Sequence, residues 1–202
     1  MKKRVKLITT IASLCLAVAL MAFGVYAATN SNFGVTSKVS YTVSEEVHVQ
    51  FDVAVAFTSN VNRTEGTTEG QLTIDATSAK LTNAIVQKPG EGNVQGSIDL
   101  GAYAFQPGVT TSDYVEYTIK IKNLGKYDAN VVVTGLLKND NTKSVTITRT
   151  LTNVELTDGT GNESGTIAKE TEATFVVKFA MADVTTDYAE TTFNPTFVVS
   201  AK

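Results

Sequence analysis

The sequence predicts an all-β protein, an antiparallel β-sandwich of jelly-roll or immunoglobulin-like type that follows an N-terminal signal peptide. Three observations lead to this prediction. Short segments alternate apolar and polar residues with period two, turns rich in Gly, Asp and Asn separate them, and beyond residue 28 no amphipathic pattern of three helical turns occurs. We therefore expect eight to ten short strands in one domain.

The first 27 residues have the pattern of a signal peptide. Four basic residues at positions 2–6 precede an apolar stretch, Leu7–Val25, and small residues offer cleavage after Ala27 or Ala28. The apolar stretch is almost as long as the ~20 residues that span a bilayer, so an uncleaved anchor is the alternative. We expect residues 28–202 to form a single exported β-sandwich, secreted or at the cell surface, and membrane-anchored if the signal is not cleaved.

Composition limits the class of partner. The only cysteine, Cys15, lies in the signal peptide, so the exported part has no disulfide, which favours a bacterial origin, with a Gram-positive-like surface as one fit. The formal net charge is −3 and becomes more negative once the basic start is removed. An acidic, Thr-rich surface argues against a nucleic-acid partner, which requires a basic footprint.

The first two predicted strands follow directly. Apolar residues alternate with polar ones over Val35–Val43 and, more strongly, over Val47–Phe57, as on the inner face of a sheet. The polar stretch Thr58–Gly70 is predicted to be a loop, either a surface excursion or a binding loop. Leu72–Ile74 and Leu81–Val86 are weaker strand candidates.

The middle of the chain contains the clearest alternation. Ile98, Leu100, Ala102 and Ala104 share one parity and lead into a turn at Phe105-Gln-Pro-Gly108. Beyond it, a strand at 114–123 and a second at 131–135 are joined by a short turn, so we expect Phe105–Gly135 to contain a hairpin. No residue in this stretch has a catalytic pattern.

The last third contains three more predicted strands. Val145, Ile147 and Leu151 define the first, and because Arg149 shares their inward parity, we expect a bulge or the end of the strand to turn it away from the core. Ala173–Phe179 forms the second. Phe193–Val199 closes the chain, and since Pro195 cannot donate to a ladder, we expect this strand to lie at a sheet edge or to begin near it.

Searching for chemistry yields no site. His48 is the only histidine, it shares parity with the outward residues of its strand, and neither HExxH nor GxSxG is present. The acidic pairs match no calcium loop and are best interpreted as solvated surface charge. We expect no catalytic residue, no metal ligand and no cofactor, and therefore no enzyme.

Several motifs together resemble a known family. These are the basic start, the apolar run that ends in GVYAATNSNF (Gly24–Phe33), PG before an alternating strand, IKNLGKYDANVVV (Ile121–Val133) and TIAKETEATFVVKF (Thr166–Phe179). The pattern resembles the TasA/camelysin-type exported proteins of Firmicutes. The resemblance implies a jelly-roll-like sandwich, export through an ER-like signal peptidase, and a role in biofilm-matrix fibres or at the cell surface. Some camelysin relatives are called metalloproteases, but no residues here match a zinc site.

The resemblance also implies that the first strand can leave its own domain and complete the sheet of the next subunit. Residues 29–43 form the candidate donor strand, and its inward residues are Val35, Val39, Tyr41 and Val43. The alternative is an ordinary first strand that pairs within its own sheet. The expected function is a secreted structural protein that self-associates into fibres, and the alternative is a binding module for a glycan or host protein.

Overall fold

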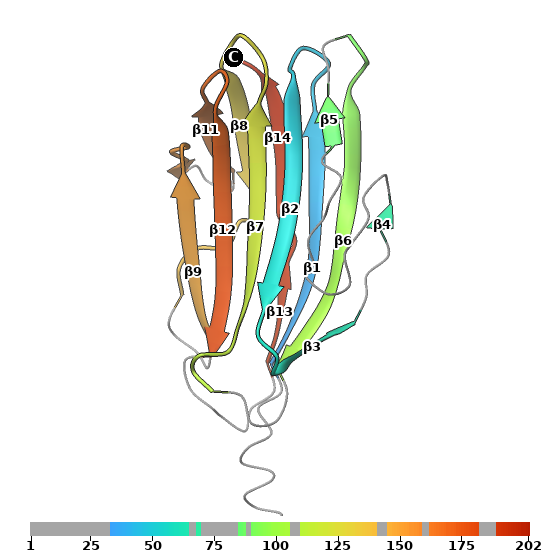
Figure 1. The fold of residues 1–202 in the computed structure, drawn as a ribbon. Coiled ribbons are helices and arrows are strands. Elements are labelled where there is room, and N and C mark those ends of the chain that lie inside the picture. Colours follow the sequence, from blue (N-terminus) through green and yellow to red (C-terminus); the bar gives the residue numbers. More distant parts are fainter. Residues whose placement is uncertain are drawn as a thin grey trace, which may run out of the picture.

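A computed structural model describes residues 33–64, 68–69, 85–87, 90–105, 110–140, 145–158, 162–181 and 189–202. Within these ranges every regular element is a strand, and the strands form two sheets packed face to face (Figure 1). This confirms the predicted all-β sandwich. The described ranges contain fourteen strands rather than eight to ten, because several have only two to four residues. The signal peptide and its cleavage residues, Ala27 and Ala28, lie outside the described residues.

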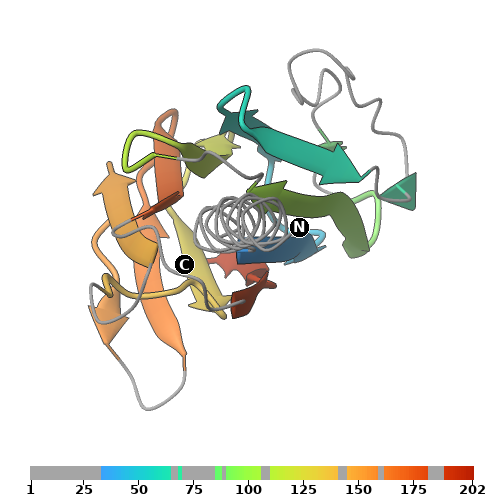
Figure 2. The same ribbon diagram turned by 90° about the horizontal axis from the view of Figure 1, so that it is seen from below.

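The larger sheet, sheet A, has the strand order β10-β11-β8-β14-β1-β6-β3, with β13 also paired to β1 and β4 to β6. Its strands are β1 (Phe33–Val43), β3 (Val61–Thr64), β4 (Thr68–Glu69), β6 (Val94–Phe105), β8 (Ala129–Thr134), β10 (Thr157–Asp158), β11 (Glu163–Ile167), β13 (Ala189–Phe193) and β14 (Thr196–Ala201). Sheet B has the order β5-β2-β7-β12-β9. Its strands are β2 (Val49–Phe57), β5 (Ile85–Gln87), β7 (Tyr114–Asn123), β9 (Val145–Thr152) and β12 (Glu172–Met181). Figure 2 looks along the strands at the two layers.

Consecutive strands lie in opposite sheets, apart from the short pairs β3–β4, β10–β11 and β13–β14. The predicted hairpin in Phe105–Gly135 is therefore wrong, because β7 lies in sheet B and β8 in sheet A. Their connection crosses between the layers and is held by Asn123, whose side chain is buried. Its Nδ2 donates to the carbonyls of Tyr127 (2.8 Å) and Ile167 (3.2 Å), and its Oδ1 accepts from the Gly125 N–H (2.9 Å).

Strand β6 contains a bulge that changes which of its residues face the core. Gly101 has a φ of +86°, its N–H donates to Asp99 Oδ1 (2.9 Å), and the pairing with β1 shifts by one residue there. The inward parity consequently passes from Leu100 to Tyr103 and Phe105. Ala102 and Ala104, which share the parity of Ile98 and Leu100 in the sequence, therefore do not face the core.

The closing segment does not lie at an edge. It is divided by Asn194 and Pro195 into β13 and β14, which both pair in parallel with β1, while β14 also pairs with β8. Pro195 therefore occupies a break inside sheet A, where its carbonyl accepts the Ser40 N–H (2.9 Å). Pro195 has no N–H to donate. Because it lies between β13 and β14 rather than within either strand, no ladder hydrogen bond of sheet A is lost.

The polar stretch predicted as a loop contains strands. Within Thr58–Gly70, β3 and β4 pair with β6 and extend sheet A. The polar composition of the stretch gave no indication of this strand pairing. Of the two weaker candidates, Leu72–Ile74 lies outside the described residues, and β5 overlaps the end of Leu81–Val86.

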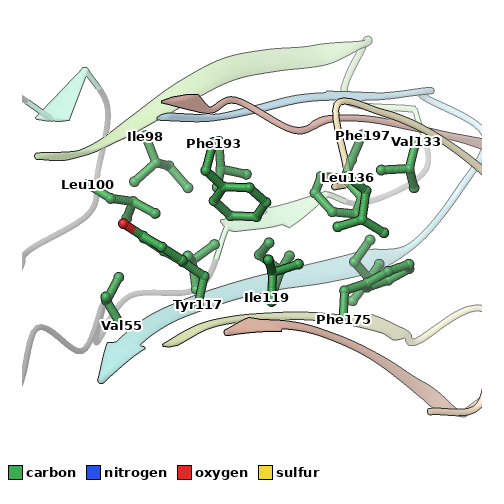
Figure 3. Packing of buried hydrophobic residues seen from close by; sticks show 14 of the residues in the cluster. Val55, Ile98, Leu100, Tyr117, Ile119, Val133, Leu136, Phe175, Phe193 and Phe197 are labelled. Carbon is green, nitrogen blue, oxygen red and sulfur yellow. The ribbon is translucent and has the colours of Figure 1, made fainter. Parts of the chain in front are cut away.

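Aromatic side chains from both sheets fill the core (Figure 3). Tyr117 of β7 packs against Phe193 of β13, with ring centroids 4.8 Å apart. Phe175 of β12 meets Phe197 of β14 at 5.1 Å in an edge-on arrangement. Contacts of this geometry between rings of opposite sheets add to the stabilisation that comes from burial of apolar area.

Candidate functional site

Strand β1 occupies the middle of sheet A, between β6 and the pair β13 and β14 (Figures 1 and 2). The structure places all four residues of the candidate assembly strand on one buried face: Val35, Val39, Tyr41 and Val43 are each at most 6% exposed. In this structure the strand completes its own sheet. It thus makes the interactions of an ordinary first strand.

Both edges of β1 are paired over nearly all of its length. On one side the antiparallel register with β6 runs from Gly34 opposite Ala104 to Val43 opposite Val94. On the other side, β13 pairs with residues 33–37 and β14 with residues 40–43, in parallel. If β1 were withdrawn, sheet A would be left with two unpaired edges and an apolar trough between them. We call this position the β1 slot.

The ring of Tyr41 lies over Gly96 of β6. A Cβ added to Gly96 would come within 2.7 Å of Tyr41 Cζ, so the ring occupies the space that any other side chain would need. The same ring contacts Phe51 of sheet B at 5.6 Å between centroids. Burial raises the pKa of the Tyr41 hydroxyl above its usual value.

A polar residue interrupts the apolar face of β1 opposite the β6 bulge. Ser37 is fully buried, and its Oγ donates to the Gly101 carbonyl at 3.2 Å. The Tyr117 ring lies in the same part of the core. Burial raises the pKa of its hydroxyl, and the neighbouring Ser37 lowers it only in part.

The chain leaves β1 through a short turn, residues 44–48, that crosses to β2 in sheet B. The Ser44 N–H donates to the Val199 carbonyl (2.9 Å), and the Glu45 N–H donates to Asn93 Oδ1 (3.0 Å). The Gly90 N–H donates to the Glu45 carbonyl at 2.9 Å. Glu45 and Glu46 are exposed. This turn is the covalent link between β1 and every later described strand.

His48 lies at the end of this turn and is half-buried rather than a surface residue on the strand. It lines a hollow of about 510 Å³ with residues of the β7–β8 connection, Lys126, Tyr127 and Asp128, and with Lys202. Tyr127 is 84% exposed. Among the residues that the structure describes, no three His, Cys, Asp or Glu side chains are grouped to hold a metal ion.

Arg149 is held by a partner that the sequence analysis missed. Its Nη1 donates to both carboxylate oxygens of Glu163 at 2.8 and 2.7 Å, which joins β9 of sheet B to β11 of sheet A. Strand β9 pairs with β12 without interruption from Val145 to Thr152, so the predicted bulge is wrong. The sequence did contain a hint of this partner: Glu163 and Ile167 are four residues apart in one strand, so both point to the same, buried face.

A second hollow, of about 1,070 Å³, is lined by residues of β8, β11 and β14 and of the segment after β9. That segment lies close against β11, since a Cβ on Gly165 would lie 2.5 Å from the Glu155 carbonyl oxygen. The hollow is lined mainly by uncharged polar and aliphatic residues, among them Asn130, Val132, Thr157 and Ser200. In the described part of the chain, no helix is long and apolar enough to cross a membrane.

Comparisons with known proteins give weak likenesses. No protein-family model matches the chain, and no curated protein matches its sequence. Among solved structures, the yeast delta-COP-I mu-homology domain has 8% identity and a TM-score of 0.21, with 85% of this chain and 96% of that chain covered. The Fcho1 mu homology domain of Danio rerio has 6% identity and a TM-score of 0.21, covering 85% and 94%. The major pilin of Streptococcus pyogenes has 15% identity and a TM-score of 0.23, covering 84% of this chain and 48% of the pilin. At these scores none of the three indicates a function.

Proposed function

We propose that this protein is an exported structural subunit that assembles into extracellular or cell-surface fibres by exchanging β1 between copies. One observation carries the proposal: the strand nearest the N-terminus in the described chain lies in the centre of sheet A and is paired on both sides. Its departure would open a slot along the sheet. A strand with the same inner side chains is the natural occupant of that slot.

Energetics favour an occupied slot. Each buried valine of β1 contributes roughly 1.5–3 kcal/mol through burial, and unpaired strand edges associate readily with other strands. An empty slot is therefore strongly unfavourable. Since a second copy carries the same residues at the same spacing, exchange replaces every lost contact with an equivalent one. Only the turn at residues 44–48 must open.

The role we propose is structural rather than catalytic, and its partner is a second copy of this chain. Export would expose the strand outside the cell, after removal of the segment that precedes it by an ER-like signal peptidase. Matrix or cell-surface components are further possible neighbours of the fibre.

The test is negative-stain electron microscopy of the purified, processed protein with β1 either free or locked. Ser40 and Ser97 are opposite one another in the register, so Ser40→Cys with Ser97→Cys places a disulfide between β1 and β6 of one chain. We expect filaments from the wild type and from the reduced double variant. Oxidation before assembly should abolish them.

Each single cysteine variant, treated with the same oxidant, is the matched control and should still form filaments. Filaments from the oxidised double variant would overturn strand exchange. No filaments from the wild type at any concentration tested would overturn assembly, and would favour the binding module, with the hollow beside β8 and β11 as its first candidate site.

A further inference from the structure

We propose that Tyr41 and Gly96 set the register in which β1 pairs in its slot, and thereby the register in which β1 of a second copy can be inserted. The identity of the occupant rests on the proposed strand exchange. The register itself is a property of each chain and can be tested without exchange.

Alternation alone leaves this register ambiguous. Because successive side chains of a strand alternate between its two faces, a shift by two residues leaves Val35, Val39 and Val43 on the inner face of β1. A shift by one residue would turn the whole strand over and is excluded by burial. A strand that enters a slot from another molecule therefore needs a second feature to choose among registers of the same parity.

The pair of Tyr41 and Gly96 supplies that feature. The Tyr41 hydroxyl and ring occupy the position of the missing Gly96 side chain, with Cζ 2.7 Å and Cε1 3.2 Å from where a Cβ would be. In one two-residue shift Tyr41 would face Val94, and in the other it would face Ile98. Either branched side chain would overlap the ring in the orientation that it has here, because this close approach needs a residue with no Cβ.

The β6 bulge provides an independent anchor four residues earlier on β1. Ser37 meets the Gly101 carbonyl there, and the register shift lies between Ser37 and Lys38. In either two-residue shift a valine would replace Ser37 at the bulge, so the buried Gly101 carbonyl would lose its hydroxyl donor. The two anchors agree on one register. Tyr41 is the larger of the two and is the one we expect to dominate.

Inter-chain disulfides can read the register of an exchanged strand. In a Cys15→Ser background, one population carries Gln95→Cys, and a second carries either Thr42→Cys or Ser40→Cys. Thr42 is opposite Gln95 in the observed register, and Ser40 would be opposite Gln95 after a two-residue shift. We expect the mixture with Thr42→Cys to cross-link in large excess over the mixture with Ser40→Cys.

Adding Tyr41→Ala to the donating chain should raise the shifted cross-link several-fold relative to the observed-register one, whereas Tyr41→Phe should leave the ratio unchanged. Gly96→Ala in the receiving chain tests the other half of the pair and should act like Tyr41→Ala. A ratio that is unaffected by both Tyr41→Ala and Gly96→Ala overturns the proposal.

Failure of strand exchange has a different signature: neither mixture forms an inter-chain disulfide. In that case the same cysteine pairs are placed within one chain, and the yields of the two intramolecular disulfides report the register directly. The expected effects of Tyr41→Ala, Tyr41→Phe and Gly96→Ala are unchanged. Equal effects from Tyr41→Phe and Tyr41→Ala would show that the ring does not set the register, and would overturn the proposal.

Discussion

Arg149 and Glu163 form an ion pair between the two sheets, with a single guanidinium nitrogen shared by both carboxylate oxygens. The side chains are 18% and 10% exposed, so the pair is largely removed from water on the side of the sandwich where β9 and β11 lie. The Arg149 backbone N–H also donates to Asn139 Oδ1 at 2.5 Å, which ties the β8–β9 connection to the same place. A partly buried pair of this kind is costly to break on one side.

Removing one partner should therefore destabilise the fold more than removing both. We expect Arg149→Met and Glu163→Leu each to lower the free energy of unfolding by about 2–4 kcal/mol, because each leaves its partner poorly compensated. The double variant Arg149→Met with Glu163→Leu should recover much of that loss. Urea unfolding of all variants in a double-mutant cycle measures the coupling. Strictly additive losses would contradict the interpretation, and the exposed pair Lys120–Glu172 is a matched control expected to give less than about 1 kcal/mol.

Asp113 ties together two connections, β2–β3 and β6–β7. Its carboxylate accepts from the Thr110 N–H (2.6 Å), Thr110 Oγ1 (3.2 Å) and Asn60 Nδ2 (3.2 Å). Burial alone would raise its pKa, but the hydrogen bonds from Thr110, Thr58 and Asn60 outweigh it and lower the pKa.

A lowered pKa in the folded state means that Asp113 stabilises the fold most when it is ionised. The contribution is present above the unfolded aspartate pKa of about 3.9 and is lost as pH falls through the lower, folded value. Asp113→Asn should thus be less stable than the wild type at pH 7, and the difference in urea midpoint should shrink below about pH 4. Asp128→Asn, at a more exposed carboxylate, serves as the control. A difference that is constant from pH 7 to pH 3 would exclude ionisation as the cause.

The fold class could be predicted because alternation of apolar and polar residues indicates which face of a strand is buried. This alternation is present in Val35–Val43, Val49–Phe57 and Ala173–Phe179. Alternation does not record the partner strand. Strands β7 and β8 both have one apolar face, whether they form a hairpin or lie in opposite sheets, and so the hairpin prediction was wrong.

Three other features depend on contacts between residues far apart in the sequence: the β6 bulge, the orientation of Arg149, and the close approach of Tyr41 to Gly96. The β6 bulge depends on Gly101 and its pairing with β1, and the inward orientation of Arg149 depends on Glu163. The residues of the candidate assembly strand were predicted to face inward, and they do. Gly96 was not singled out, because its role exists only opposite Tyr41.

Gly135 follows the end of β8 and lies close to the backbone of Asn194, in the break that precedes β14. Substituting it shows how tightly that break is held. Its φ is +71°, and an added Cβ would lie 2.6 Å from the Asn194 carbonyl oxygen, which is backbone and cannot turn aside. Gly90 has a similar φ of +84°, but an added Cβ there would meet nothing within 4 Å. The two glycines therefore share the backbone strain that an alanine would suffer and differ in the clash alone.

We expect Gly90→Ala to lower the free energy of unfolding by about 1–2 kcal/mol, the cost of a left-handed conformation for a residue with a Cβ. Gly135→Ala should cost that amount and a further ~1–3 kcal/mol for the overlap with Asn194. Thermal and urea unfolding of the two variants, side by side, gives the difference. If Gly135→Ala were no more damaging than Gly90→Ala, the β13–β14 break would have to move freely. The carbonyl that Pro195 presents to β1 would then be a weak contact, and the slot would be held mainly by β6.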